Sequence, residues 1–304
     1  MKKNLNTKLT PLVSIIIPTY NHAKFIRKAL NSVINQTYHN WEAIIIDNNS
    51  TDETYKIFDK ITDSRIRYLK INNNGIIAKS RNVGIKEANG EWIAFLDSDD
   101  FWSEEKLEVC IRNINDSIDF IYHDLESLHH IPKIFFNSKK FIGRQLNKPI
   151  LNDILISTIS KGTAIGQSSV FIRKTILDKI GGISENKKLV ASEDYNTWLR
   201  IAQVTNNFKY INKRLGYFLI HEGSTQKKKN LSIPQREAVS SFMYLFDRKE
   251  KLNLEVKLKY MSGCYNASIN NKDEAKKDFM FVFKNSKLTL RFKSLLKIII
   301  LIFT

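Results

Sequence analysis

Three carboxylates lie within one short stretch, at Asp97, Asp99 and Asp100, directly after the apolar run of residues 92–96. Like charges this close repel each other unless they are protonated, solvated or bridged by a cation. Hard divalent ions such as Mn²⁺ and Mg²⁺ take oxygen ligands and commonly share them with substrate phosphates. The cluster therefore favours a diphosphate ligand held through Mn²⁺ or Mg²⁺, although a short Asp-rich turn in a solvated loop has the same pattern.

Short β-branched runs alternate with helical patterns over residues 1–125, which is typical of parallel βαβ units. We therefore expect an α/β fold with a doubly wound, mostly parallel sheet flanked by helices. Strands are expected at residues 13–17, 41–47, 66–71, 91–97 and 119–122. Helices are expected at residues 25–34, from a capping box at residues 50–53 to about residue 61, and from Ser103 onward.

The first, second and fourth of these strands end on Pro18-Thr19-Tyr20, Asp47 and Asp97. Carboxyl ends of parallel strands meet at one sheet edge, where open α/β sheets bind ligands. There Tyr20 could pack on a base, Asp47 could accept a proton from a base N–H, and Asp97 could bind ribose hydroxyls. The structural alternative is equally open: Tyr20 covers the edge, Asp47 caps its loop, and Asp52 satisfies the first turn of a helix.

Three stretches occur in a fixed order along the first half of the chain: SIIIPTYNHAKFIRKALNSVINQTYHNWEAIIIDNNSTDET, then NNGIIAKSRNVGI, then GEWIAFLDSDDFW. Together they resemble the family 2 inverting glycosyltransferases, whose GT-A fold is a nucleotide-sugar-binding α/β sheet. The resemblance implies a metal-dependent enzyme that uses Mn²⁺ or Mg²⁺. It also implies a nucleotide-sugar-binding set: Pro18, Thr19 and Tyr20 beside the uridine, Asp47 at the uracil, Asp52 near the base, Arg81 at the phosphates, Asp97 at the ribose, and Ser98 next to it.

Asp99 is implied as the metal ligand by the same resemblance. One departure from the family pattern is the loop Asn48-Asn49-Ser50, where members often have Asp-Gly-Ser. Asn adopts left-handed backbone conformations more readily than most residues, so we expect the turn to be kept at Asn49.

The second half carries the segment GGISENKKLVASEDYNTWLRIAQVT, in which Gly181-Gly182 should end one helix and Glu193-Asp194 should begin another. It is similar to the family's Glu-Asp motif, whose second acid deprotonates the acceptor hydroxyl. Asp194 is therefore the candidate catalytic base, with Glu193 and Trp198 as acceptor-binding or supporting residues. In the structural alternative the two acids stabilise the helix dipole and Trp198 faces the core.

His221 follows the apolar run of residues 215–220. Resemblance to GT-A enzymes, which often place a histidine there, makes it a candidate second metal ligand and would favour Mn²⁺. A purely structural histidine is the alternative. Residues 162–173 resemble the part of the family fold that lines the acceptor pocket, with Gln167 and Ser168 only suggestive.

The chain has 304 residues, 42% hydrophobic and 26% charged, with a net charge of +17, and its Cys110 and Cys264 suggest neither a disulfide framework nor a zinc site. We expect a GT-A catalytic domain at residues 1–230, with a nucleotide-binding half (1–125) and an acceptor-binding half (126–230), followed by a helical appendage at 231–304. The tail, residues 284–304, joins the cations Lys287, Arg291, Lys293 and Lys297 to an apolar end at residues 295–303. Such a helix suits an anionic membrane surface, or else docks on the protein with a solvated Lys face.

The resemblance implies an inverting enzyme that moves a hexose or N-acetylhexosamine from a UDP-sugar to a hydroxyl of a glycan acceptor in surface polysaccharide synthesis (O-antigen, capsule or lipopolysaccharide), and we expect that acceptor to be lipid-linked. We expect it in the cytoplasm, peripheral on the inner face of the cell membrane. The first alternative is a nucleotidyltransferase acting on a sugar phosphate, which would want a Gly-rich basic loop after the first strand. The second, a nucleic-acid-binding protein, rests only on charge, and no nucleic acid partner is expected.

Overall fold

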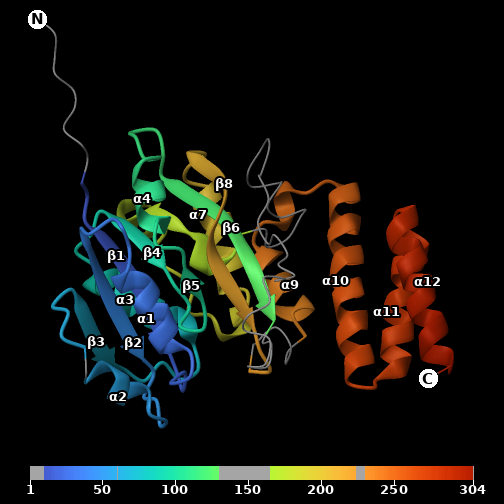
Figure 1. Cartoon of the computed structure of the whole chain (residues 1–304). Coiled ribbons are helices and arrows are strands. Elements are labelled where there is room, and N and C mark those ends of the chain that lie inside the picture. The colour runs from blue at the N-terminus through green and yellow to red at the C-terminus, as the bar shows by residue number, and fades with distance from the viewer. Residues whose placement is uncertain (1–9, 60, 130–164, 224–229, 304) are drawn as a thin grey trace, which may run out of the picture. The chain divides into compact units, whose positions relative to one another are not determined.

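The computed structural model describes residues 10–59, 61–129, 165–223 and 230–303 (Figure 1). These residues belong to two compact units. The first unit contains the chain up to residue 129 together with 165–183 and 203–220, and the second contains 184–202 and the described residues from 221 onward. Each unit is described by itself.

The first unit is built on one mixed sheet. Its strands are β1 (Val13–Thr19), β2 (Trp41–Asp47), β3 (Ile66–Lys70), β4 (Trp92–Phe95), β5 (Phe101–Trp102), β6 (Phe120–His129), β7 (Phe171–Arg173) and β8 (Phe208–Ile220). Their order across the sheet is β3-β2-β1-β4-β7-β6-β8-β5. The pairs β3-β2, β2-β1, β1-β4 and β6-β8 are parallel, whereas β7 runs antiparallel to both of its neighbours and β5 runs antiparallel to β8.

Helices cover both faces of this sheet, so the expected doubly wound arrangement is confirmed. They are α1 (Ile26–Ile34), α2 (Thr54–Phe58), α3 (Ile77–Glu87), α4 (Lys106–Ile111) and α6 (Lys174–Lys179), with a short 3₁₀ turn, η2 (Gln167–Ser169). Because side chains alternate along a strand, Ile15 and Ile17 of β1 share a core with α1, and Ile16 faces the other way. A Cβ on Gly84 of α3 would lie 2.5 Å from Ile16 Cγ2, so only glycine permits this close helix–sheet contact.

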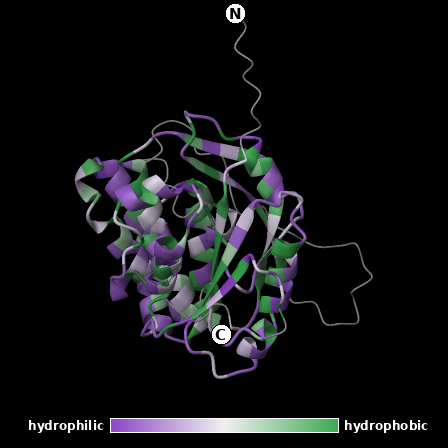
Figure 2. Ribbon diagram, turned by 90° about the vertical axis from the view of Figure 1, so that its left-hand side faces the viewer, coloured by the Kyte–Doolittle hydropathy of each residue, from purple (hydrophilic) through white to green (hydrophobic). Residues whose placement is uncertain are grey.

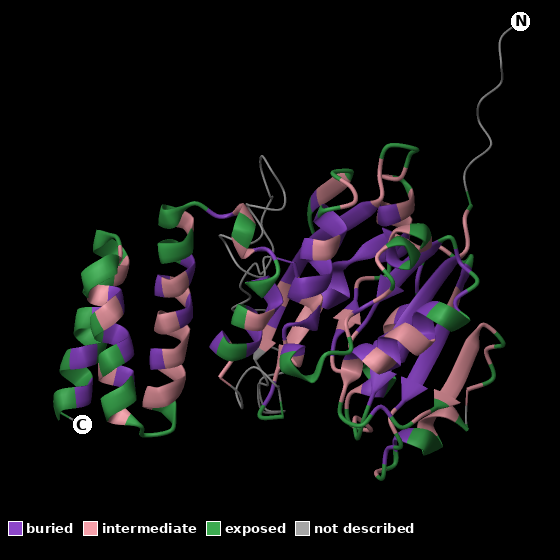
Figure 3. Cartoon of the chain, turned by 180° about the vertical axis from the view of Figure 1, so that it is seen from behind, coloured by how far each residue is buried: buried purple, intermediate pink, exposed green. Residues whose placement is uncertain are grey.

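The buried strands form the hydrophobic centre of the first unit. All seven residues of β1 are buried, and green, hydrophobic stretches run along the central strands in Figure 2. The same strands are mostly purple, that is buried, in Figure 3. Burial on both faces explains why these segments read as continuous apolar runs in the sequence.

Two predicted helix starts are wrong. Helix α2 begins at Thr54 and ends at Phe58, and Ser50 does not cap it because its hydroxyl donates to Asp47 instead. Helix α4 begins at Lys106, since Phe101 and Trp102 form the short strand β5 and Ser103 Oγ donates to the Leu215 carbonyl at 3.3 Å. In both places another residue took the hydroxyl that the local pattern assigned to a cap: Asp47, three residues away, accepts from Ser50, and Leu215, distant in sequence, accepts from Ser103.

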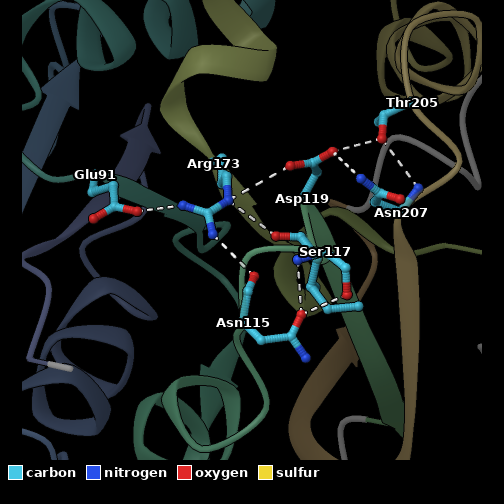
Figure 4. Close-up of polar contacts among 8 residues, drawn as sticks. Glu91, Asn115, Ser117, Asp119, Arg173, Thr205 and Asn207 are labelled. Atoms are coloured by element: carbon cyan, nitrogen blue, oxygen red, sulfur yellow. Dashed lines mark hydrogen bonds and ion pairs between the residues drawn. The ribbon is translucent and has the colours of Figure 1, made fainter. Parts of the chain in front are cut away.

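A polar cluster around Arg173 joins the amino ends of β4 and β6 to the end of β7 (Figure 4). Its guanidinium donates to the carbonyls of Ile118, at 3.0 Å, and Asn115, at 3.1 Å. It also lies 3.6 Å from Asp119 and pairs with Glu91. This cluster lies at the edge of the sheet opposite to the ends of β1, β2 and β4, because Arg173 pairs in register with Trp92 at the start of β4.

The second unit is helical. Its elements are η3 (Lys187–Leu189), α7 (Glu193–Ala202), α9 (Ser232–Ser240), η4 (Met243–Leu245), α10 (Arg248–Ser268), α11 (Lys272–Asn285) and α12 (Leu288–Phe303). One core joins Leu199 of α7 to Val239 of α9 and Leu254 of α10, and a second joins Phe279 of α11 to Leu301 of α12. Asp247 and Glu250 form a reciprocal capping box at the start of α10.

The predicted helix boundaries in the segment from Gly181 onward are confirmed. Helix α6 ends at Lys179 and is followed by Gly181 and Gly182, with φ of +70° and +76°, a conformation that glycine adopts without strain. Helix α7 begins at Glu193. The proposed division of the chain at residues 125 and 230 stays a prediction.

Candidate donor-binding edge and catalytic residues

The ends of β1, β2 and β4 meet at one edge of the sheet, as the sequence predicted. Thr19 lies opposite Asp47 in the parallel register, and Ile16 lies opposite Phe95, two residues before Asp97. Pro18 and Thr19 are buried there, whereas Tyr20 is 51% exposed. Thr19 Oγ1 is buried and has no hydrogen-bond partner among the described residues, which is the kind of polar atom that a bound ligand can satisfy.

The loops that follow β1 and β2 are held together by side chains. Asn21 has a φ of +51° and accepts hydrogen bonds from the amides of Thr51, at 2.8 Å, and Asp52, at 3.3 Å. In return, the Asn21 amide donates to Ser50 Oγ at 2.9 Å. The expected left-handed turn at Asn49 is present, with a φ of +52°. The base side of the predicted donor site is therefore fixed by cross-loop hydrogen bonds rather than by regular structure.

Asp47 is fully buried and supports this loop. Its carboxylate accepts from the Ser50 amide at 3.1 Å, from Ser50 Oγ and from Tyr68 Oη at 2.5 Å. Burial, together with the Asp47 carboxylate, raises the pKa of Tyr68, which therefore stays a proton donor. The contact of Asp47 with uracil stays a prediction, beside the loop-supporting role that these contacts establish.

Asp52 also supports the loop rather than only a helix end. Its oxygens accept from the amide of Thr54 at 3.0 Å and from the amide of Ala23 at 3.0 Å. Burial raises the pKa of Asp52, but the hydrogen bonds from Thr54 and Ala23 and the nearby His22 outweigh it, so the pKa lies below its usual value. Asp52 is thus held as a carboxylate next to the predicted base pocket.

Arg81 and Asp97, which the sequence assigned to phosphate and ribose separately, form one ion pair. Arg81 Nη2 lies 2.7 Å from Asp97 Oδ1, and the Arg81 side chain is 3% exposed while that of Asp97 is 27% exposed. Arg81 belongs to helix α3, and its side chain reaches the turn at the end of β4 through the contact with Asp97. A guanidinium fixed in this way can hold a carboxylate and still present positive charge to an anionic ligand.

Residues Asp97 to Asp100 form a single turn, closed by the Asp100 amide donating to the Asp97 carbonyl at 2.9 Å. Asp97 and Asp99 are partly exposed, whereas Ser98 and Asp100 are buried. Burial, then the charges of Asp99 and Asp97, raise the pKa of Asp100 well above its usual value. The turn therefore has two partly exposed carboxyl groups, Asp97 and Asp99, and one buried carboxyl group, Asp100.

The exposed pair is the part of this turn that fits a metal. Asp97 and Asp99 offer carboxylate oxygens, the donors that Mn²⁺ and Mg²⁺ accept, and these ions commonly complete their shells with water and substrate phosphates. In the part of the chain that the structure describes, no three His, Cys, Asp or Glu side chains gather as a complete protein-only metal site. The donor set fits an ion shared with a diphosphate ligand.

Asp194 and Glu193 lie in the first turn of α7, in the second unit, where acidic residues stabilise the helix dipole. Asp194 is partly exposed, and its Oδ1 accepts from the Tyr195 amide at 2.7 Å. Glu193 is 6% exposed and accepts from the Ala191 amide at 2.8 Å. Trp198 is 1% exposed and packs in the interior. Of these three, Asp194 alone has solvent access suited to meeting a substrate.

His221 is 9% exposed, and its Nδ1 accepts a hydrogen bond from the Gly223 amide at 3.1 Å. A neutral imidazole that accepts through Nδ1 carries its proton on Nε2. Metal binding through Nε2 would therefore require this contact to be given up. The ligand role of His221 stays a prediction, and the structure describes a histidine arranged as an Nε2–H donor.

Two residues near the donor edge were missed by the sequence reading. His22 Nδ1 lies 2.7 Å from Ser98 Oγ and so links the loop after β1 to the turn after β4. Ser168 lies in the segment that resembles the acceptor-lining part of the family fold, but its hydroxyl faces that same turn, 3.1 Å from the Asp97 amide. Neither residue has a pattern that points to this role, because both contacts span more than seventy residues of sequence.

Comparisons with known proteins give these features a family. Residues 14–172, just over half of the chain, match the family described as Glycosyl transferase family 2. A relative from Escherichia coli, the UDP-Glc:alpha-D-GlcNAc-diphosphoundecaprenol beta-1,3-glucosyltransferase WfgD, is 35% identical over 203 residues, which is 66% of this chain and 73% of the relative.

Solved structures share the fold. TarS (1-349) from S. aureus, in complex with UDP-GlcNAc, superposes with a TM-score of 0.64 at 20% identity, covering 91% of this chain and 82% of TarS. The mannosyltransferase PcManGT from Pyrobaculum calidifontis, in complex with GDP-Man and Mn²⁺, gives 0.61 at 15% identity, covering 92% and 77%. The predicted GT-A fold is thus confirmed, and with the sequence match it follows that the chain is a member of glycosyl transferase family 2.

Proposed function

We propose that this glycosyltransferase moves a hexose or N-acetylhexosamine from a UDP-sugar to a hydroxyl of a lipid-linked glycan acceptor in surface polysaccharide synthesis. The observation that carries the donor half is the single edge on which Tyr20, the Arg81–Asp97 ion pair and the partly exposed Asp99 meet. The acceptor half is supported by the relative WfgD, whose name describes glucosyl transfer from UDP-Glc to a diphosphoundecaprenol-linked GlcNAc.

The proposed chemistry is a direct displacement with inversion. Asp194 accepts the proton of the acceptor hydroxyl as that oxygen attacks C1 of the sugar from the face opposite the diphosphate. The buried guanidinium of Arg81 offsets the charge that develops on the leaving diphosphate. Asp97, Ser98 and Asp99 hold the ribose and the metal-facing side of the donor, and Glu193 and Trp198 support the segment that carries Asp194.

We further propose that Mn²⁺ or Mg²⁺ binds at Asp99, with His221 as a candidate second ligand. A divalent ion there would supply positive charge to the diphosphate leaving group. The support is the oxygen donor set of the turn and a Mn²⁺-containing structure of the same fold. His221→Gln tests the second ligand: Mn²⁺-dependent UDP affinity should fall if His221 binds the ion, and unchanged affinity would limit His221 to a structural role.

Calorimetry with UDP tests the donor site directly. The wild-type chain should bind UDP more tightly with Mn²⁺ than without it, and Asp99→Ala should remove that difference. Ser117→Ala, a change at an exposed loop near the opposite edge of the sheet, is the control and should bind like wild type. Equal UDP affinity of Asp99→Ala and wild type in Mn²⁺ would remove the metal role of Asp99.

The alternative functions receive no specific support. A nucleotidyltransferase would need a basic, Gly-rich phosphate loop after β1, and the chain has Pro18-Thr19-Tyr20-Asn21 there. Binding to nucleic acid still rests on net charge alone. The family match favours transfer of a sugar over both.

We also propose that α12 attaches the enzyme to the inner face of an anionic membrane, where a lipid-linked acceptor would lie. In the described part of the chain, no helix is both long and apolar enough to span a membrane. Helix α12 packs through Ser294, Ile298 and Leu301, and much of its remaining surface is green, that is exposed, near the carboxyl end in Figure 3.

The exposed surface of α12 is amphipathic in the sense that an interfacial helix requires. Large apolar side chains recur at spacings of three and four residues: Leu288 (80% exposed), Phe292 (70%), Leu296 (53%), Ile299 (42%) and Phe303 (83%). At helical spacing, Arg291 borders this stripe on one side and Lys293 and Lys297 border it on the other. Cations at both borders suit a stripe that lies in anionic lipid.

Vesicle sedimentation tests this attachment. The triple variant Phe292→Gln, Leu296→Gln, Phe303→Gln should bind phosphatidylglycerol vesicles about 100-fold more weakly, since losing three mostly exposed apolar anchors removes about 3 kcal/mol of interfacial burial. The double variant Ile233→Gln, Ile269→Gln, at exposed apolar residues outside α12 (67% and 53%), is the matched control. Equal sedimentation of the triple variant and this control would rule out attachment through α12.

A further inference from the structure

Asp100 differs from the other two carboxylates of its turn, because it is 2% exposed and cannot meet a ligand directly. Ser168 Oγ donates to Asp100 Oδ2 at 2.6 Å, and the Leu219 amide donates to Asp100 Oδ1 at 3.1 Å. A buried carboxylate is expensive to keep in a protein interior. Its two oxygens are here used to tie the turn after β4 to the η2 turn and to the end of β8.

Ser168 contacts both ends of the same turn. Its Oγ accepts from the Asp97 amide at 3.1 Å while donating to the Asp100 carboxylate. Its carbonyl accepts from Trp102 Nε1 at 2.7 Å, which fixes the η2 turn against β5. A single hydroxyl therefore spans the first and last residues of the turn, in parallel with the backbone bond that closes it.

We propose that Asp100 and Ser168 form a positioning pair that holds the Asp97–Asp100 turn in its donor-binding conformation. This inference rests on the proposed function and deepens it. Four-residue turns have several accessible backbone conformations. With both ends tied to Ser168, the turn keeps Asp97 and Asp99 toward solvent and Asp100 inward, so the donor-binding oxygens are in place before the donor arrives.

Three variants separate this role from general support. Ser168→Ala removes the hydroxyl that joins Asp97 to Asp100. Asp100→Asn keeps an oxygen for the Leu219 amide and an amide for Ser168 Oγ, but removes the ionisable group. Ser169→Ala is the matched control, because Ser169 is a fully buried serine of the same η2 turn whose hydroxyl donates to the Gly166 carbonyl at 2.7 Å.

The measurements are UDP affinity with Mn²⁺ by calorimetry, the KM values for donor and acceptor, and Tm for folding. Ser168→Ala should weaken UDP binding about tenfold and raise the donor KM similarly, with the acceptor KM unchanged. Ser168→Ala and Ser169→Ala should lower Tm to a similar degree, but Ser169→Ala should bind UDP like wild type. Asp100→Asn should lower UDP affinity by no more than a few-fold. The double variant of Ser168 and Asp100 should bind UDP no more weakly than Ser168→Ala alone, because the two residues act as one unit.

Several results would overturn the pairing. Equal UDP affinity of Ser168→Ala and Ser169→Ala would reduce Ser168 to ordinary packing. If Asp100→Asn lowered UDP affinity far more than Ser168→Ala does, and only with Mn²⁺ present, the Asp100 carboxyl group would act on the metal itself. If Ser168→Ala does not fold, Asp100→Asn and Asp100→Ala provide the comparison: equal, large losses in both would contradict a hydrogen-bonding role. If the wild-type chain did not bind UDP, that result would instead contradict the proposed function, and the positioning role that rests on it.

Discussion

Removing the Arg173 guanidinium should destabilise the first unit more than any exposed ion pair does. Arg173 lies at the end of β7 with 21% of its side chain exposed (Figure 4). Its guanidinium carbon lies over the Trp92 ring, 4.6 Å from the ring centre. Its charge meets two backbone carbonyls and the Asp119 carboxylate, which is 15% exposed. Asp119 in turn accepts from Thr205 Oγ1 at 2.6 Å, so the cluster also reaches the segment before β8.

The expected magnitude for Arg173→Ala follows from these contacts. The charged hydrogen bond to the partly buried Ile118 carbonyl is worth about 1.5 kcal/mol, the exposed one to the Asn115 carbonyl less, and the contact with the Trp92 ring about 0.5–1 kcal/mol. The pair with Glu91 adds little, because Glu91 is 54% exposed. Leaving Asp119 without this cation adds a further penalty, so we expect a loss of about 3–5 kcal/mol in the free energy of unfolding.

Urea unfolding of the full chain measures this loss. Arg173→Ala should lower the midpoint by about 1.5–2.5 M for a slope of ~2 kcal/mol per molar. Arg214→Ala is the control, because Arg214 is 63% exposed and pairs with Glu126 at 3.3 Å, which predicts less than about 1 kcal/mol. UDP affinity of folded Arg173→Ala should match wild type, since the cluster lies at the sheet edge away from Asp97. Equal midpoints for the two arginine variants would refute the reasoning.

Three further predictions concern the site and the interior. Arg81→Lys should weaken UDP binding about tenfold, because an ammonium cannot reproduce the planar fork that pairs with Asp97, and calorimetry showing wild-type affinity would contradict this. Asp194→Asn should keep UDP affinity but lose transfer by about 10²–10⁴-fold in a UDP-release assay, and a variant that still turns over would exclude Asp194 as the base. Burial, then the charge of Lys106, lower the pKa of His123 from 6.5 to about 3. As the pH falls, His123 is therefore protonated in the unfolded chain before it is protonated in the folded one. The free energy of unfolding should therefore be about 2 kcal/mol lower at pH 5 than above pH 6.5. In urea titrations at the two pH values, His123→Phe should not show this part of the decrease.

The strands of the first unit could be predicted because their sequence pattern follows directly from burial. β2 has the predicted bounds, Trp41–Asp47, since its residues are almost all buried and no helical spacing competes. The helix at Glu193 was predicted for a similar reason, as its acids and apolar residues are local signals. The acidic ends of the strands could be placed at one edge because parallel pairing fixes where carboxyl ends lie.

The predictions that failed depended on contacts that the local sequence pattern does not show, most of them with residues far away in sequence. Ser50 has the spacing of a helix cap, but Asp47 takes its hydroxyl, and Tyr68 from β3 completes that arrangement. Strand β5 has two residues and exists through its pairing with β8, so no periodic pattern could reveal it. The contacts of Ser168 with Asp97 and Asp100 likewise arise from the fold, and no residue pattern near Ser168 encodes them.

Hydrogen bonding at the donor edge accounts for how irregular loops can form a defined site. The loop after β1 is held to the loop after β2 through Asn21, and to the turn after β4 through His22 and Ser98. The buried Asp100 then holds that turn to η2 and β8. A ligand that meets loops already fixed in this way spends less of its binding free energy on ordering them. Under the proposed function, these polar residues hold the loops of the edge in one geometry for a charged donor, at the cost of placing polar groups in a partly buried setting.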